Sequence, residues 1–401
     1  MFRIEMLPAA HGDCLWIEYG TGDEVHRILI DGGPAHTYPS LRERILHLPA
    51  DDRNFDLLVV THIDADHIEG IIRLLRDWQA LGCRFDRIWF NGRDQLNAVP
   101  DPAGEPLGAT QGEYLGILIG DYQQAVGKDV WNVDFDNRII GIDPEADGLP
   151  APVTLPGGCR LTVLSPDFDR LLELKDRWRE ELRKARVISG DVDELRRKLE
   201  ANRQLKPLGD VLGAEDEPME GRFEIPDPDG RDTDVELADA LGGDGEPGGD
   251  ADFGGDPSLA NGSSIALLLE YPAGDPEVRM LLSGDAWPSV LEASIGTLLE
   301  RDDARLKLTG FKIPHHGSVG NLSESFLGRI SCKHYLVSTS GAIFRHPHAR
   351  AVELLLEKHN GRAIPRLHFN YLTETTAPWV KQEDDDRRLY SFHPKGLSLE
   401  L

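Results

Sequence analysis

The sequence predicts a layered α/β fold, and three observations support this prediction. Apolar residues make up 40% of the 401-residue chain, which is enough for a sizeable buried core. In the first ninety residues, short runs rich in β-branched residues alternate with stretches of helical spacing. A similar alternation returns after residue 259. Strands that alternate with helices in this way favour a fold in which helices pack against a sheet.

The expected elements follow one another in a simple order. The first part of the chain contains strands at 15–19, 27–30, 57–60 and 87–90 and helices at 41–48 and 68–81. The last part contains strands at 264–271, 279–282, 307–313 and 335–338 and a helix at 347–359. Between these parts we expect a short helix near 113–126, a strand at 160–164 and two charged helices at 167–187 and 191–205.

This pattern divides the chain into five segments. Residues 1–90 and 259–401 are the two halves of the main domain, and residues 91–165 are a loop-rich continuation of the first half. Residues 166–212 form a charged helical hairpin, which is either a solvated pair of helices with internal ion pairs or a basic arm that holds an anionic substrate. Residues 213–258 contain sixteen acidic residues, two arginines and many glycines, a composition typical of a flexible insertion.

The composition also indicates the cellular compartment and the kinds of partner to expect. Four widely spaced cysteines without a CxxC pair indicate reduced thiols rather than a disulfide scaffold. No apolar run is long enough to cross a bilayer and the amino terminus lacks the pattern of a secretory signal, so we expect a cytoplasmic protein without a membrane partner. The net charge of -27 opposes binding to nucleic acid, but about half of it lies in residues 213–258, away from the motifs described next.

The strongest motif is THIDADHIEG at residues 61–70, which places four metal-binding side chains within six positions. It lies on the expected loop between a buried strand and a helix. Imidazole and carboxylate ligands together suit Zn²⁺, Mn²⁺ or Fe²⁺. His62 and Asp64 alternate along the loop and can face one ion, whereas Asp66 and His67 at the start of the helix can face a second. A helix cap at Asp66 is the structural alternative, but it would not explain the neighbouring histidines.

Other candidate residues follow apolar strands. Asp285 comes at the end of LLSGD, where a carboxylate can bridge two cations, although Ser-Gly-Asp is also a common turn. Asp31, in Asp-Gly-Gly, is either a turn residue or a carboxylate that orients a ligand histidine. His315 and His316 lie in PHHGS after the strand at 307–313, and one of two adjacent histidines would ordinarily be a solvated loop residue.

These motifs resemble those of the metallo-β-lactamase-fold hydrolases, whose signature loop has the form HxHxDH. Asp64 replaces the second histidine here, and the THxDxDHxxG form is similar to the hydrolase domain of bacterial DNA-uptake channel proteins and their stand-alone relatives. The match extends to HGD at 11–13, ILIDGG at 28–33, NGSS at 261–264, LLSGD at 281–285 and HHGS at 315–318. The resemblance implies a four-layer αββα sandwich with a long middle insertion.

The resemblance also implies a site for two divalent metal ions, Zn²⁺ or Mn²⁺. The implied metal ligands are His62, Asp64, Asp66, His67, Asp285 and His315. Because a carboxylate is a harder ligand than imidazole, Asp64 shifts the preference from Zn²⁺ toward Mn²⁺ or a mixed pair. We identify no third-motif histidine between His67 and Asp285, so one ion would be held less tightly.

Further residues complete this expected site. Asp13, Asp31 and Asn261 would orient the ligands from behind. His346 lies in RHP, which is similar to a late Gly-His-Pro element of the same proteins, with Arg in place of Gly. The residues expected to act on the nucleophile or the leaving group are Asp66, His316 and His346.

We therefore expect a hydrolase that uses a metal-activated hydroxide. The likeness to DNA-uptake proteins favours a phosphodiesterase that acts on an anionic substrate, a nucleic acid or a nucleotide. Acyl hydrolysis, as by a lactonase, thioesterase or β-lactamase, is the alternative because the fold hosts these activities as well. A non-enzymatic binding member of the fold is a third interpretation, and the middle insertion is a candidate contact for a protein partner.

Overall fold

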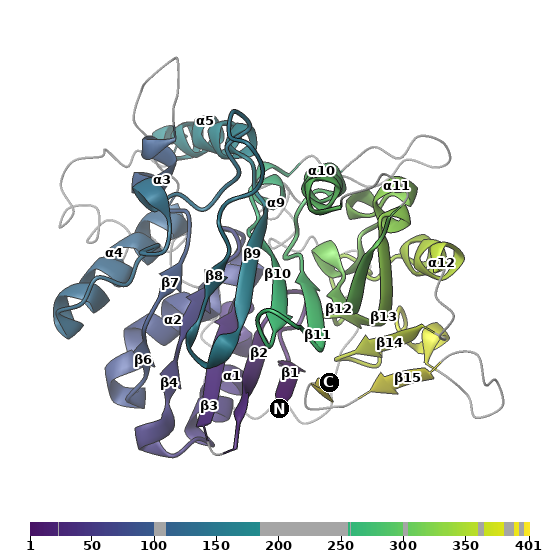
Figure 1. The fold of residues 1–401 in the computed structure, drawn as a ribbon. Coiled ribbons are helices and arrows are strands. Elements are labelled where there is room, and N and C mark those ends of the chain that lie inside the picture. The colour runs from purple at the N-terminus through teal and green to yellow at the C-terminus, as the bar shows by residue number, and fades with distance from the viewer. Residues whose placement is uncertain are drawn as a thin grey trace, which may run out of the picture.

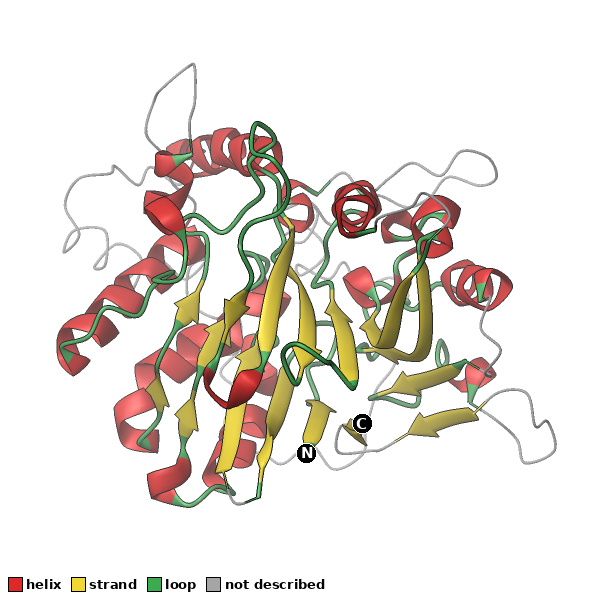
Figure 2. Cartoon of the chain, viewed as in Figure 1, coloured by secondary structure: helices red, strands yellow, loops and turns green. Residues whose placement is uncertain are grey.

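The computed structural model describes residues 1–22, 24–99, 110–184, 256, 258–299, 304–359, 365–380, 389–392 and 397–401. Within these ranges the chain forms a mixed α/β structure, as the sequence predicts, with two large sheets and helices outside them (Figures 1 and 2). The second helix of the expected hairpin, at 191–205, and nearly all of the acidic segment 213–258 lie outside the described residues.

The first sheet has six strands in the order β16-β1-β2-β3-β5-β7. β1 (Phe2–Met6), β2 (Leu15–Thr21) and β3 (Glu24–Ile30) are antiparallel neighbours. β5 (Leu57–Val59) and β7 (Ile88–Trp89) extend the sheet in parallel with β3. β16 (Leu397–Glu400) pairs antiparallel with β1, so the last strand of the chain returns to the sheet that the first strands build.

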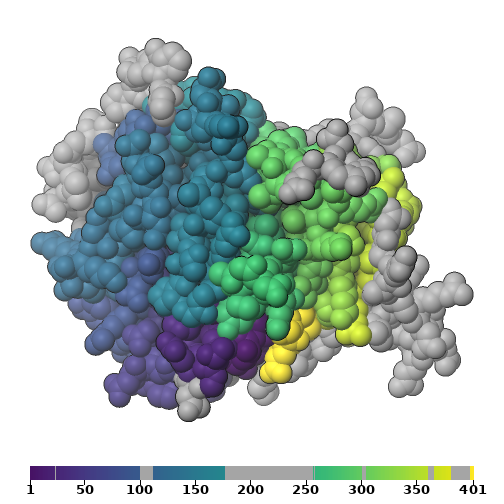
Figure 3. All heavy atoms as spheres, in the orientation of Figure 1, coloured from purple at the N-terminus to yellow at the C-terminus, as the bar shows by residue number. Residues whose placement is uncertain are grey.

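The second sheet has eight strands in the order β15-β14-β13-β12-β11-β10-β9-β8. Its antiparallel part is built by β8 (Val153–Thr154), β9 (Arg160–Ser165), β10 (Ala266–Tyr271) and β11 (Val278–Leu282). Its parallel part continues from β11 through β12 (Leu306–Lys312), β13 (Ile330–Val337), β14 (Arg366–Phe369) and β15 (Leu389–Phe392). β9 and β10 are neighbours although a long segment separates them in sequence, and their teal and green surfaces adjoin in Figure 3.

Three apolar clusters show how these elements are layered. One cluster fills the space between the sheets, with Ile17 of β2 and Leu269 of β10 among its members. A second cluster joins the other face of the first sheet to α1 (Tyr38–Leu46), α2 (Ala65–Leu81) and α4 (Thr110–Val126). A third joins the other face of the second sheet to α10 (Pro288–Leu298), α11 (Glu324–Gly328) and α12 (Ala349–Lys358). The order is therefore helices, sheet, sheet, helices.

The expected strands and helices are present within a few residues of their predicted bounds wherever the structure describes them. α5 (Phe168–Lys184) is the first helix of the expected hairpin. The segment 91–165, expected to be mostly loops, contributes α3 (Arg93–Ala98) and α4 to the first half of the fold and β8 and β9 to the second sheet. β1, α10, β14 and the two-stranded sheet of β4 (Asn54–Phe55) and β6 (Arg84–Phe85) were not expected.

All four cysteines are buried, and no disulfide joins them. The helices within the described ranges are too short or too polar for any of them to cross a membrane.

The parallel strands explain where the motifs meet. Asp31 follows β3, Thr61 and His62 come soon after β5, Asp285 follows β11, and the histidine pair at 315–316 follows β12. The carboxyl ends of parallel strands share one edge of a sheet, where ligands commonly bind. A hydrogen bond of 2.9 Å from the Ile265 amide to the Thr61 carbonyl joins the edges of the two sheets at this point. The motifs of both halves therefore face one another.

Candidate metal centre

The motif 61–70 includes the loop before α2 and the first turns of that helix, and no side chain caps the start of the helix. Asp64 occupies the N-cap position, and its side chain accepts no hydrogen bond from the helix backbone. Asp66 lies in the first turn rather than at the cap. Helix capping therefore does not account for either carboxylate, which leaves both available for another role.

His67 is oriented by Asp31. Its Nδ1 lies 2.8 Å from Oδ2 of Asp31, which also accepts hydrogen bonds from the Thr61 amide at Oδ1 (2.8 Å) and from the Thr61 hydroxyl at Oδ2 (2.7 Å). Because the carboxylate can only accept, Nδ1 of His67 carries the hydrogen, and the lone pair of the neutral ring lies on Nε2.

His62 is held by the same network. Its Nδ1 lies 2.9 Å from Oγ1 of Thr61. The hydroxyl hydrogen of Thr61 already points to Asp31, so Oγ1 accepts a hydrogen bond from Nδ1 of His62. The lone pair of His62 is therefore also on Nε2.

His316 is also held in a fixed orientation, by Ser338 of the second half of the chain and by Asp13 of the first half. Its Nδ1 donates to the Ser338 carbonyl at 2.9 Å and lies 3.5 Å from Oδ1 of Asp13. Asp13 is in turn paired with the fully buried Lys312, whose Nζ is 2.6 Å from Oδ2. Nε2 of His316 thus faces away from this support, with its lone pair free to bind a cation.

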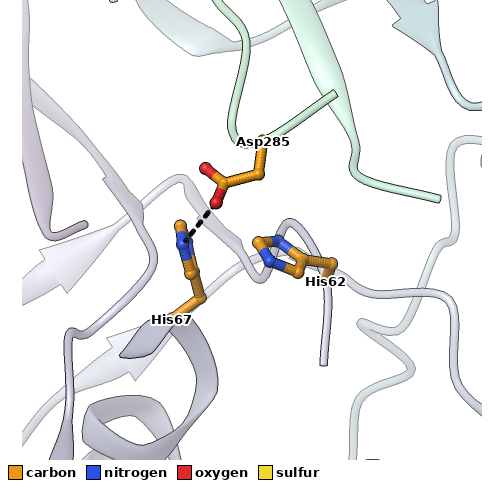
Figure 4. Close-up of side chains that lie close together, drawn as sticks. All are labelled: His62, His67 and Asp285. Atoms are coloured by element: carbon orange, nitrogen blue, oxygen red, sulfur yellow. Dashed lines mark ion pairs between the residues drawn. The ribbon is translucent and has the colours of Figure 1, made fainter. Parts of the chain in front are cut away.

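The three Nε2 atoms converge on Asp285. Oδ2 of Asp285 lies 3.4 Å from Nε2 of His67 and 3.5 Å from Nε2 of His316, and Figure 4 shows the carboxylate facing the rings of His67 and His62. Oδ2 of Asp66 is 3.3 Å from Nε2 of His316 and 3.8 Å from Nε2 of His67. Ligand atoms that share one ion with bonds of about 2.1 Å lie about 3–3.4 Å apart, so these separations suit a shared cation.

The burial of these atoms supports the same conclusion. Nε2 of His62, His67 and His316 and Oδ1 of Asp285 are buried, and none makes a hydrogen bond to the part of the chain that the structure describes. A buried polar atom without a partner costs free energy unless an ion or water satisfies it. Three groups among the described residues bring their ligand atoms close enough to hold a metal ion: His62-His67-Asp285, Asp66-His67-His316 and Asp13-Asp31-His67. In the third group Nδ1 of His67 already donates to Asp31, so the first two groups are the candidates for a metal site.

The cluster also contains more negative than positive charge. Among the described residues, Asp13 is paired with a lysine, whereas Asp31, Asp66 and Asp285 have no lysine or arginine within 4 Å. Buried carboxylates are normally paired or coordinate metals. A bound divalent cation would balance this excess of negative charge.

The histidine pKa values reflect this excess. Burial opposes a charge on His67, but the carboxylates of Asp285, Asp66 and Asp31 outweigh it and raise the pKa of His67 well above its ordinary value. Burial likewise opposes a charge on His316, but Asp285, Asp13 and Asp66 raise its pKa to about 9. The site therefore attracts positive charge, which a proton or a metal ion can supply.

The structure places His315 differently from its neighbour. Its Nδ1 lies 2.9 Å from Oδ1 of Asn321 and 3.3 Å from Nδ2 of Asn261. Both of these amides also donate to Oδ2 of Asp256, each at 2.8 Å. His316, rather than His315, brings a ring nitrogen to the carboxylates of Asp66 and Asp285, although the resemblance led us to expect His315 there.

The remaining expected residues lie around the cluster. Oδ2 of Asp64 is 3.5 Å from Nε2 of His62. His346 is buried, and its ring centroid lies 5.2 Å from that of His315 and 6.3 Å from that of His316. His346 is therefore beside the cluster and belongs to none of the ligand groups found within the described ranges.

Several residues of the site were not identified from the sequence. Lys312 lies within an apolar strand, where its partner Asp13 could not be recognised because that residue comes from the opposite half of the chain. Asp256 and Asn321 follow no recognisable motif, and Asp256 belongs to the segment expected to be flexible. His11 belongs to the HGD motif, but no role was predicted for it; in the structure burial lowers its pKa to about 4, although the nearby charge of Asp66 acts to raise it.

The donor set of nitrogen and carboxylate atoms fits divalent cations such as Zn²⁺ or Mn²⁺. The His and Asp groups of this centre could thus hold a metal ion. A comparison with protein-family models found no match to this chain, and a search of curated proteins found none either.

Proposed function

We propose that this chain is a two-metal-dependent hydrolase of the metallo-β-lactamase fold and that its substrate is a phosphodiester. The observation that carries the proposal is that Nε2 of His67 and Nε2 of His316 both lie close to the carboxylates of Asp66 and Asp285. His62 lies close enough to His67 and Asp285 to share an ion with them. The layered order of helices and sheets is consistent with that fold.

The residues divide into two ligand sets around Asp285. Asp66, His67 and His316 would hold one ion. His62, with Asp64 beside its Nε2, would hold the other, and the carboxylate of Asp285 lies close enough to His62, His67 and His316 to serve as a ligand in either set. The second set has fewer ligands, so we expect this ion to exchange more readily and to favour Mn²⁺ because of its carboxylates.

Two bound metal ions would supply an activated water as nucleophile and positive charge for the transition state. Side chains of the protein would orient the nucleophile, protonate the leaving group and position the metal ligands. Burial raises the pKa of Asp66, but His67, His316 and His11 outweigh it and hold this pKa well below its ordinary value. Asp66 therefore remains a carboxylate that can orient the nucleophile by accepting a hydrogen bond. His315 and His346 lie beside the cluster without belonging to the ligand sets, so either can donate a proton to the leaving group. Asp31 and the pair of Asp13 with Lys312 keep the ligand rings in place.

An anionic substrate is favoured by the surroundings of the site. α5, which carries six basic and five acidic residues, packs against α9 (Leu259–Gly262), the short helix that contains Asn261. The guanidinium of Arg170 on α5 lies 5.2 Å over the ring of Trp287, two residues after Asp285. Cations held by these residues would suit the negative charge of a phosphate diester.

The test combines metal analysis with diester hydrolysis. We expect about two metal ions per chain and Mn²⁺-stimulated hydrolysis of bis-p-nitrophenyl phosphate, both lost in Asp66→Ala and His67→Ala. His47→Ala is the matched control, since His47 is an exposed histidine at the end of α1. Metal binding without diester cleavage would turn the assignment toward acyl substrates. A protein that binds no metal would refute the proposal.

A further inference from the structure

A chain of rings leads from the metal centre to the surface. We define the aromatic rim as His11, His36, Phe344 and His346. Phe344 contacts both His346 (ring centroids 5.9 Å apart) and His11 (6.0 Å), and His11 is stacked on His36 at 6.3 Å. The inner end of the rim is His346, 6.3 Å from His316.

Three distant segments hold this rim in a fixed arrangement. The Ser340 amide donates to the Ala10 carbonyl at 2.6 Å, and the Ala10 amide donates to the Tyr371 hydroxyl at 2.9 Å. The Thr375 hydroxyl donates to the His346 carbonyl at 2.7 Å. The loops around residues 10, 343 and 373 are thereby tied together, so the rings are positioned before any ligand arrives.

Two residues in these loops have strained backbone conformations. Ala10 has φ 51° and Arg345 has φ 57°, in the left-handed region that residues with a side chain rarely adopt. Such conformations persist where the surrounding structure enforces them, and they cluster at ligand-binding sites. The two residues flank the rim, next to His11 and between Phe344 and His346.

The outer part of the rim is accessible and has an apolar and a cationic component. His36 is exposed and Phe344 is half-buried. The neighbouring Ile343 is 40% exposed and Leu372 is 49% exposed, although both are large apolar residues. The side chain of Arg345 is 75% exposed, with only a loose ion pair of 3.9 Å to Glu374.

The rim begins directly at the metal centre. Gly12, next to His11, lies so close to the Asp66 carbonyl that an added Cβ would be 1.8 Å from its oxygen. His11 therefore stands beside Asp66, one of the metal-binding residues proposed above. A ligand held at the ions would extend past His11 and His346 toward Phe344.

We propose that the aromatic rim binds the nucleobase of a nucleotide whose phosphate occupies the metal centre. This inference rests on the proposed function and adds the substrate class to it. Every nucleobase has a planar face that stacks on aromatic rings, and Arg345 can contribute both a charge for phosphate and a planar group for stacking. A run of rings with polar edges fits a base better than it fits an aliphatic acyl chain, which would need a pocket lined by aliphatic side chains.

The experiment measures binding of two phosphate ligands to the Mn²⁺-loaded protein by calorimetry. Adenosine 5′-monophosphate and ribose 5-phosphate share the phosphate and the sugar, and they differ in the base. We expect the nucleotide to bind about tenfold more tightly, as for the stacking of one base. Phe344→Leu keeps an apolar side chain but removes the ring, and it should abolish this tenfold difference while ribose 5-phosphate binds as before. Phe344→Trp should retain the difference.

Controls separate this inference from the proposed function. Val133→Ala removes another exposed apolar side chain and should leave both affinities unchanged. Equal binding of the two ligands to the native protein, with metal bound and diester cleaved, would overturn the rim assignment alone. Loss of all metal and phosphate binding would overturn both proposals. A single-stranded oligonucleotide that binds more tightly than the mononucleotide, and loses this advantage as salt is raised, would identify a polymer as the source of the base.

Discussion

Oδ2 of Asp285 lies 3.4 Å from Nε2 of His67 and 3.5 Å from Nε2 of His316. The two histidines come from opposite halves of the chain, and Asp285 approaches both of them from the turn that follows β11. These distances are too long for good hydrogen bonds and suit ligands of a common ion. Asp285 is therefore the residue on which the two ligand sets depend.

Asp285→Asn keeps the size of the side chain and removes its charge. We expect both metal ions to bind at least about 100-fold more weakly, with a parallel loss of diester hydrolysis. Competition with a metal-sensitive dye measures this affinity. Asp134→Asn is the control, because Asp134 also accepts hydrogen bonds, from Arg87 and Trp89, but lies away from the cluster. Unchanged metal binding in Asp285→Asn would remove the bridging role.

Asp31→Asn tests how His67 is oriented. The substituted amide can no longer accept from both His67 and Thr61 as the carboxylate does, so Nε2 of His67 loses its fixed direction. Metal affinity should fall about 10–100-fold. Asp77 on the same helix accepts a hydrogen bond from Tyr38, so Asp77→Asn should alter stability without altering metal affinity. Equal effects of the two substitutions on metal binding would contradict this assignment.

Lys312→Met tests the buried ion pair beneath His316. The substitution leaves the Asp13 carboxylate buried without its cation, which should lower the free energy of unfolding by about 3–5 kcal/mol. Combining it with Asp13→Asn removes the unpaired charge and should recover part of this loss. Denaturant unfolding of the four proteins in the cycle measures the coupling. Additive losses would show that the two side chains do not act as a pair.

The pKa of His316 predicts how the metal-free protein responds to pH. Because the folded-state pKa of about 9 is above the unfolded value of 6.5, this proton stabilises the fold below pH 6.5, and its contribution disappears as the pH rises through about 9. The loss should be on the order of 1–3 kcal/mol. Unfolding of the metal-free protein between pH 6 and 10 measures it, with His316→Gln as the reference that should lack this dependence.

Metal binding should show the opposite dependence on pH. A cation must displace the proton from Nε2 of His316, so the apparent metal affinity should increase as the pH rises toward 9. Each ion that binds at neutral pH should release protons, which a weakly buffered titration detects. Metal affinity that does not change between pH 6.5 and 9 would contradict the proposed role of His316 as a ligand.

Much of this protein could be predicted from local patterns. Strands such as β3, β5 and β11 are continuous apolar runs, and α2 has strong helical spacing, so their positions follow from periodicity alone. The motif 61–70 stands out because histidines and carboxylates alternate over a few positions. Local patterns therefore predict the mixed α/β fold and select His62, Asp66, His67 and Asp285 as candidate site residues.

Neighbouring residues with equal chemistry could not be distinguished in this way. His315 and His316 are adjacent, and both have positive φ, at 45° and 54°, so the turn sends their rings in different directions. Ser338 holds Nδ1 of His316, and Asn321 holds Nδ1 of His315. These partners come from loops that follow other elements, and only the folded chain brings them to the turn.

The sequence by itself determined which segments become strands and helices and which residue types stand at the strand ends, because those properties depend on local periodicity and chemistry. The tertiary structure decided which of these side chains meet. Lys312 pairs with Asp13, Asp256 supports the amides around His315, and the rings of His11 and Phe344 touch, each across a long separation in sequence. Such contacts arise from the packing of two sheets against each other, and packing is a property of the whole chain.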